Sequence, residues 1–215
     1  MKSIQYLILF ATLCSPLVSR AAVTFNMAGA TLYESDGTTP VPTTGLMLLV
    51  ADTSGTNGFS SVAGGASLSL NSFLNGTDDL ILAKWALGAS SATPGFFSDA
   101  VSNLTLGANN WDAGDALALL WFPTLTTSSG TALAGDSYGI YYNSATSGAS
   151  LDSGDAWITP ASGTKSLNLL TTDYSGSHTS ASTTASFTVS GVPEPSRALL
   201  AALGLGMVSL RRRRR

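Results

Sequence analysis

Apolar and polar residues alternate in short runs along the middle of the chain, and small or turn-forming residues separate the runs. Alternation with a period of two is typical of a strand with one buried face, whereas a continuous apolar run between turn residues is typical of a strand buried on both faces. The pattern predicts about nine or ten short strands. They cover residues 22–27, 45–51, 66–70, 80–87, 101–106, 116–122, 136–143, 155–159, 166–170 and 185–189.

Short strands at this spacing predict an all-β fold, an antiparallel β-sandwich or jelly roll, with a barrel as the alternative. We expect a signal peptide over 1–21, a sandwich domain over 22–170, a spacer rich in serine and threonine over 171–191, and a tail over 192–215. The spacer is either a polar linker or holds the last strand. Its dense hydroxyl groups also make it a candidate O-glycosylated stalk.

The N-terminal residues follow the order of a secretory signal peptide. Lys2 precedes an apolar stretch over 4–14, and Pro16 interrupts the chain just after it. A basic start, a short apolar segment and a breaker are the features of such a peptide, and the apolar segment is short for a retained membrane span. The sequence therefore predicts export through the Sec translocon.

Small residues after this stretch indicate where signal peptidase would cut. Ser19 and Ala21 stand at the two positions where the enzyme requires small side chains, so we expect cleavage after Ala21. Ala22 would then be the new N-terminus. The alternative is a lipoprotein acylated on Cys14, which is disfavoured because Leu13 occupies a position that needs a small residue.

The C-terminal residues combine three features in a fixed order. These are the motif Val192, Pro193, Glu194 and Pro195, the apolar stretch from Ala198 to Leu210, and the basic cluster Arg211, Arg212, Arg213, Arg214 and Arg215. The prolines hold the motif extended, and the apolar stretch predicts a single helix of about 20 Å. Because the hydrocarbon core is about 30 Å thick, this helix is better suited to temporary anchoring. The arginines would remain in the cytoplasm by the positive-inside rule.

This order of features resembles the PEP-CTERM sorting signal, also called the ice-binding protein C-terminal domain, and the resemblance covers residues 192–215. The signal belongs to exported proteins of Gram-negative bacteria that make an extracellular polysaccharide, or biofilm, matrix. The resemblance implies transient anchoring in the inner membrane, cleavage by exosortase, which is a membrane cysteine transpeptidase, and delivery to the envelope, surface or matrix. It implies no activity for the domain. An ordinary C-terminal membrane anchor is the alternative.

Charge is distributed unevenly along the chain. The whole chain has a formal net charge of −3, with 10 basic and 13 acidic residues. Between residues 22 and 192, however, only Lys84 and Lys165 are basic, and every acidic residue except Glu194 lies there. Two positive charges against twelve negative ones give this part a net charge of −10. Such a charge excludes nucleic acid as an expected partner and favours solubility or divalent cations.

Residues suited to catalysis are scarce in the predicted domain. The chain has one histidine, His178, which lies in the spacer, and one cysteine, Cys14, which would leave with the signal peptide. A hydrolase triad would lack its base and a zinc site its usual ligands. Paired carboxylates could serve a glycosidase, but nearly all aspartates adjoin Gly, Ser or Asn in predicted turns, where they cap backbone N–H groups. We therefore predict a protein that is not an enzyme and needs no cofactor.

Tryptophans raise carbohydrate binding as the alternative function. Trp111 lies in a predicted turn, so it is the candidate for an exposed platform that binds sugar rings. Trp121 and Trp157 are expected in the core, as is Trp85, which alternation places on one face with Ile81.

A repeated acidic pattern is the one candidate for a metal site. The pattern Asp-x-Gly-Asp-Ala occurs twice, with Asp112 and Asp115 in the first copy and Asp152 and Asp155 in the second. Such a segment forms a turn that enters a strand, or it directs oxygens at Ca²⁺. The turn is favoured, because calcium needs six or more oxygens and neither copy has the spacing of an EF-hand.

Overall fold

The computed structural model describes residues 21–29, 31–55, 58–74, 76, 78–89, 91–142, 157–169 and 183–191. Nearly all of the predicted signal peptide, most of the spacer, and the sorting motif with its apolar helix and arginines lie outside these residues, as do Asp152, Asp155 and His178. Within the described ranges, no helix is long and apolar enough to cross a membrane.

The described residues form strands with almost no helix. The strands are β1 (Ala22–Gly29), β2 (Leu46–Asp52), β3 (Asp79–Ala86), β4 (Ser98–Thr105), β5 (Ala116–Phe122), β6 (Ser137–Tyr142), β7 (Gly163–Leu169) and β8 (Phe187–Thr188). One short 3₁₀ helix, η1 (Leu87–Ala89), follows β3. The prediction of an all-β protein is confirmed.

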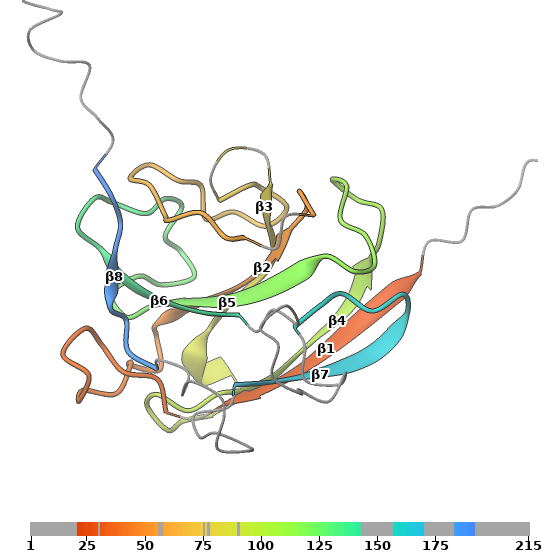
Figure 1. Cartoon of the computed structure of the whole chain (residues 1–215). Coiled ribbons are helices and arrows are strands. Elements are labelled where there is room, and N and C mark those ends of the chain that lie inside the picture. Colours follow the sequence, from red (N-terminus) through yellow and green to blue (C-terminus); the bar gives the residue numbers. More distant parts are fainter. Residues whose placement is uncertain are drawn as a thin grey trace, which may run out of the picture.

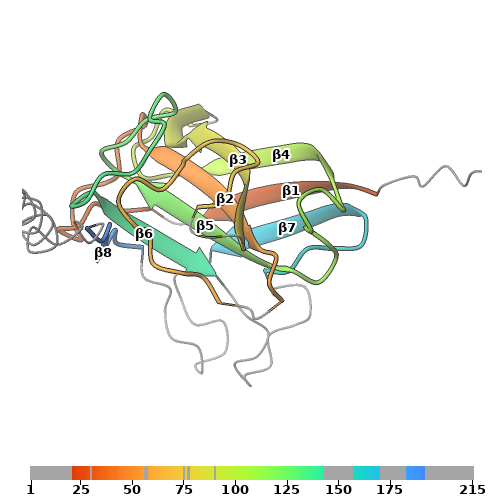
Figure 2. The same cartoon turned by 90° about the horizontal axis from the view of Figure 1, so that it is seen from above.

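The strands form two sheets that lie one above the other (Figures 1 and 2). The five-stranded sheet has the order β3-β2-β5-β6-β8, with every neighbouring pair antiparallel. The three-stranded sheet has the order β4-β1-β7, in which β1 pairs antiparallel with β4 and parallel with β7. The jelly-roll prediction is not confirmed, because a parallel pair and a division into three and five strands differ from the antiparallel arrangement we expected.

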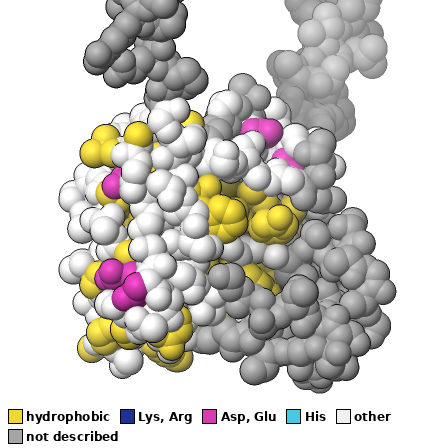
Figure 3. All heavy atoms as spheres, turned by 60° about the vertical axis from the view of Figure 1, so that its left-hand side comes forward, with side chains coloured by type: hydrophobic (Ala, Val, Ile, Leu, Met, Phe, Trp, Pro, Cys, Tyr) yellow, Lys and Arg dark blue, Asp and Glu magenta, His cyan; other side chains and the backbone are white. Residues whose placement is uncertain are grey.

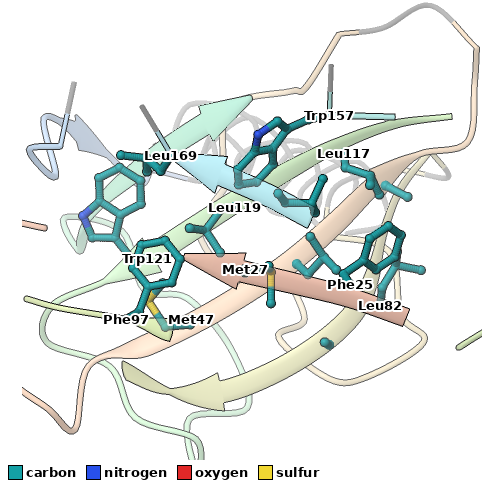
Figure 4. Close-up of a cluster of buried hydrophobic side chains, with 14 of the residues drawn as sticks. Phe25, Met27, Met47, Leu82, Phe97, Leu117, Leu119, Trp121, Trp157 and Leu169 are labelled. Carbon is teal, nitrogen blue, oxygen red and sulfur yellow. The ribbon is translucent and has the colours of Figure 1, made fainter. Parts of the chain in front are cut away.

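The main core fills the space between the sheets (Figure 4). Phe25 and Met27 of β1 point inward from the three-stranded (small) sheet, and Leu119 and Trp121 of β5 point inward from the five-stranded (large) sheet. All four side chains are at most 2% exposed. Every second residue of β1 is buried in this way, as the period of two predicts.

A second core lies on the outer face of the five-stranded sheet. Every residue of β2 and β5 is buried, so both strands are covered on two sides. Loops before β3 and after β5 lie over this face (Figure 1) and contribute Val62, Leu68 and Ala132, each fully buried. The two continuous apolar runs correctly indicated strands without a solvent-facing side.

Strand β3 departs from simple alternation because it contains a bulge. Leu49 pairs with Ala83 but Val50 pairs with Ile81, which leaves Leu82 as an extra residue. Leu82 and Ala83 therefore both join the main core, while Ile81 belongs to the second core. The prediction that Ile81 and Trp85 share a face was wrong for this reason.

Two predicted strands are not formed as strands. Residues 66–70 make only an isolated bridge, Ser67 to Thr131, and the described part of 155–159 makes only one, Ile158 to Ala116. Left-handed residues, Gly65 and Asn71, stand at both ends of the first segment and bend it out of a sheet.

Gly139 of β6 provides a test of packing between neighbouring strands. A Cβ atom added there would overlap the Trp121 indole, which is fully buried. We expect Gly139→Ala to lower the free energy of unfolding by about 1–3 kcal/mol or more, measured by denaturant titration. Gly130→Ala is the matched control, because nothing lies within 4 Å of its added Cβ. Equal stability of the two variants would contradict this packing.

Candidate functional site

Trp111, the predicted sugar platform, lies in the core. Its side chain is 2% exposed, its Nε1 donates a hydrogen bond to Thr159 Oγ1 at 2.9 Å, and its ring lies 6.4 Å from that of Phe25. Two left-handed residues just before it, Asn109 and Asn110, turn the chain so that the indole points inward. The prediction of an exposed platform at Trp111 was therefore wrong.

Replacing Trp111 tests this structural role. Trp111→Phe removes the indole N–H and leaves a void beside Thr159, which is itself 2% exposed. We expect the free energy of unfolding to fall by about 2–4 kcal/mol in a denaturant titration. Phe96→Leu, at a side chain 41% exposed, should change stability by about 0.5 kcal/mol or less. A stable Trp111→Phe protein would reopen a surface role for this residue.

Asp112 and Asp115 form a turn that leads into β5. The backbone N–H of Asp112 donates to Asp115 Oδ2 at 2.8 Å, and that of Asp115 donates to the Asp112 carbonyl at 3.3 Å. Burial raises the pKa of Asp115. Within the described ranges, no group of three or more His, Cys, Asp or Glu side chains could hold a metal ion. The turn interpretation accounts for this copy of the pattern, and the second copy lies outside the described residues.

Other aspartates also cap loops, as the sequence predicted. Asp136 Oδ2 accepts the N–H of Leu133 at 2.8 Å. Asp36 accepts the Thr39 hydroxyl and the N–H groups of Thr38 and Thr39, and these hydrogen bonds, the hydroxyl first, hold the pKa of Asp36 well below its usual range. These hydrogen bonds occupy carboxylate oxygens that would otherwise be available to a ligand.

Trp85, which was expected in the core, is only half-buried and stands at an edge of the sandwich, so that prediction was wrong. It lies near the end of β3, the edge strand of the large sheet, and faces β4, the edge strand of the small one. Its Nε1 donates a hydrogen bond to Asp99 Oδ2 of β4 at 2.9 Å. This bond joins the two sheets on the side where both edges lie together (Figure 2).

A groove of about 400 Å³ opens along these two strands. Its walls come from β3, β4 and the loop before β3, and they include Leu70, Lys84, Trp85, Asp99 and Ser102. The Lys84 ammonium donates to the Ser129 carbonyl at 2.6 Å, and burial lowers the pKa of this lysine. The groove thus combines an aromatic surface with a carboxylate.

A second hollow of about 370 Å³ adjoins the groove. Polar side chains line it, namely Asn26, Ser98, Ser166 and Asn168 from the three strands of the small sheet. Asp99 and Ala100 border both hollows, so the two meet at β4. Neither hollow was predicted, because each depends on how residues distant in sequence come together.

Acidic side chains dominate the described charges on the surface. Figure 3 shows the side of the molecule that carries β6 and β8, with hydrophobic side chains gathered in its middle and acidic but no basic described residues in view. Tyr142 and Phe187 are exposed on these two strands, by 46% and 48%.

Among the described residues, Asp79 is the one buried carboxylate with an oxygen that has no hydrogen-bond partner. It is 1% exposed at the start of β3; its Oδ2 accepts the Ser60 N–H at 3.1 Å, and its Oδ1 has no partner in the described residues. Burial, together with the charges of Asp78 and Asp52, raises its pKa to about 6. Asp52, its partner in β2, accepts hydrogen bonds from Ser54 and Gly58.

The raised pKa of Asp79 predicts that stability depends on pH. Between 3.8, its usual value, and about 6, the folded chain holds a proton that the unfolded chain releases, so stability falls as pH rises through this window. Asp79→Asn keeps an acceptor for Ser60 and should add up to about 3 kcal/mol at pH 7.5 in denaturant titrations. It should also flatten the dependence on pH. Glu34→Gln is the control, and an Asp79→Asn protein with the parent pH profile would contradict the assignment.

Comparisons with known proteins assign no family to this chain. No family model matches the chain, and no curated protein or solved structure gives a significant match. The likeness of residues 192–215 to a sorting signal therefore rests on those residues alone.

Proposed function

We propose that this chain is an exported protein without catalytic activity, sorted to the bacterial envelope, surface or polysaccharide matrix through its C-terminal tail. One observation carries the proposal: the ordered combination of Pro193-Glu194-Pro195, an apolar stretch ending at Leu210, and five arginines. Each part has a physical role in sorting, namely a rigid recognition segment, a short anchor and a cytoplasmic stop.

The N-terminus supports the same route. A signal peptide that ends at Ala21 would bring the chain to the Sec translocon and signal peptidase, and the domain that follows carries the strong negative charge of a soluble exported protein. Ala22 is the first residue of β1, so cleavage after Ala21 would keep every strand and remove only Ala21, whose carbonyl accepts the Leu106 N–H at 3.1 Å. The C-terminal apolar helix belongs to this proposal, and so does the exosortase partner.

Processing by exosortase is tested by expressing the chain in Gram-negative hosts with and without that enzyme. We expect intact mass measurements to give a product that begins near Ala22 and ends near Val192 only when exosortase is present, and fractionation to find it outside the inner membrane. A variant with alanine at Pro193, Glu194 and Pro195 should keep Arg215 and stay in the membrane.

The opposite outcome is equally clear. A parent chain that keeps Arg215 and remains in the membrane of both hosts has a plain anchor, and the sorting proposal is then wrong.

A further inference from the structure

We propose that the groove beside Trp85 and the polar hollow across β4 form one extended binding site for a neutral polysaccharide. This inference deepens the proposed function, because it names the class of ligand that an exported matrix protein would hold. It depends on the proposed function only for the location at which the protein would encounter the ligand. The site itself is argued from its side chains.

The Trp85 indole provides an oriented aromatic surface. Its inner side packs against the main core and its Nε1 is held by Asp99 at 2.9 Å, so the ring is fixed before any ligand arrives. The rest of the side chain remains open to the groove. Pyranose rings carry an apolar face of C–H groups, and burying such a face against a fixed indole costs little side-chain entropy.

Asp99 provides an acceptor next to this surface. Its Oδ2 is engaged by the indole, while its Oδ1 accepts no hydrogen bond from the described residues. A carboxylate oxygen accepts hydrogen bonds from two donors, which suits adjacent hydroxyl groups of a sugar. The carboxylate therefore fixes both the platform and a ligand that lies on it.

The hollow on the other side of β4 extends the site with groups that both donate and accept. Asn26, Asn168 and the nearby serine hydroxyls have this dual character, as sugar hydroxyls do. Consecutive residues of a strand point to opposite faces, and the half-buried Asp99 and the exposed Ala100 of β4 each border both hollows. A chain passing over the β4 edge would contact both hollows.

The charge of the domain selects a neutral ligand. A net charge of −10 between residues 22 and 192 repels anionic polymers, and the one lysine of the groove, Lys84, already donates to Ser129. Each hollow lies within the usual range of about 300–1,000 Å³ for ligand sites. Because the two hollows adjoin, they can hold several sugar units of a polymer, whereas a single monosaccharide would occupy only one of them.

Binding is tested by affinity electrophoresis of the full-length chain in native gels that contain dextran, xylan, mannan or alginate. We expect at least one of the neutral polymers to retard the protein and alginate, the anionic polymer, to leave its mobility unchanged. No retardation by any neutral polymer, or retardation by alginate alone, would overturn the proposal.

Three variants locate the site. Trp85→Leu keeps an apolar side chain but removes the platform and the Nε1 donor, and Asp99→Asn removes the carboxylate but keeps an acceptor for the indole; each should weaken binding at least tenfold. Asn168→Ala, in the other hollow, should weaken it several-fold. Parent affinity in Trp85→Leu and Asp99→Asn would overturn the proposal, and parent affinity in Asn168→Ala would overturn the extension across β4.

Controls separate binding from folding. Leu133→Ser, at a side chain 62% exposed and outside both hollows, and Asp112→Asn should bind as the parent does. Thermal unfolding is followed for every variant, and Asp99→Asn should melt within a few degrees of the parent. Because these gels contain no exosortase, loss of binding and loss of tail processing are independent results.

Discussion

The large sheet must be covered on both faces, and the rest of the structure follows from this constraint. Strands β2 and β5 have no solvent-facing side chain, so one cover alone would leave a row of apolar residues in water. The three-stranded sheet provides the inner cover through Phe25 and Met27. The loops that carry Val62 and Leu68 provide the outer cover. These long segments without regular structure therefore contain fully buried apolar residues.

The edges of the sandwich are where this arrangement leaves room. At the β3 edge of the five-stranded sheet, the three-stranded sheet ends with β4, and a groove lined by Trp85 opens along these two edge strands. The Trp85–Asp99 hydrogen bond joins the two edge strands, and both residues line the groove. A groove at an edge is therefore a consequence of pairing a sheet of five strands with a sheet of three.

Strands with a strong local signal could be predicted from the sequence, and features set by distant contacts could not. The runs that became β2 and β5 are apolar enough to be recognised alone, and the alternation in β1 identifies its buried face. The bulge at Leu82 depends on pairing with β2, and the burial of Trp111 depends on the left-handed Asn109 and Asn110 before it. Adjacent asparagines just before a tryptophan were a usable signal for that inward turn, but the groove had none, since Trp85 and Asp99 belong to different sheets.

The place of β1 has a consequence for how the chain reaches its folded state. This first strand lies in the middle of its sheet, yet both its partners follow much later, and Val23 pairs with Gly163 in β7. Pairings of such long sequence separation form slowly, because the entropy of closing a large loop must be overcome first. A chain that emerges from its N-terminus would keep β1 without its full set of neighbours until most of the domain had been made. That delay would leave the three-stranded sheet incomplete while the rest of the chain is made, which suits the export proposed above, because a translocon passes unfolded chains.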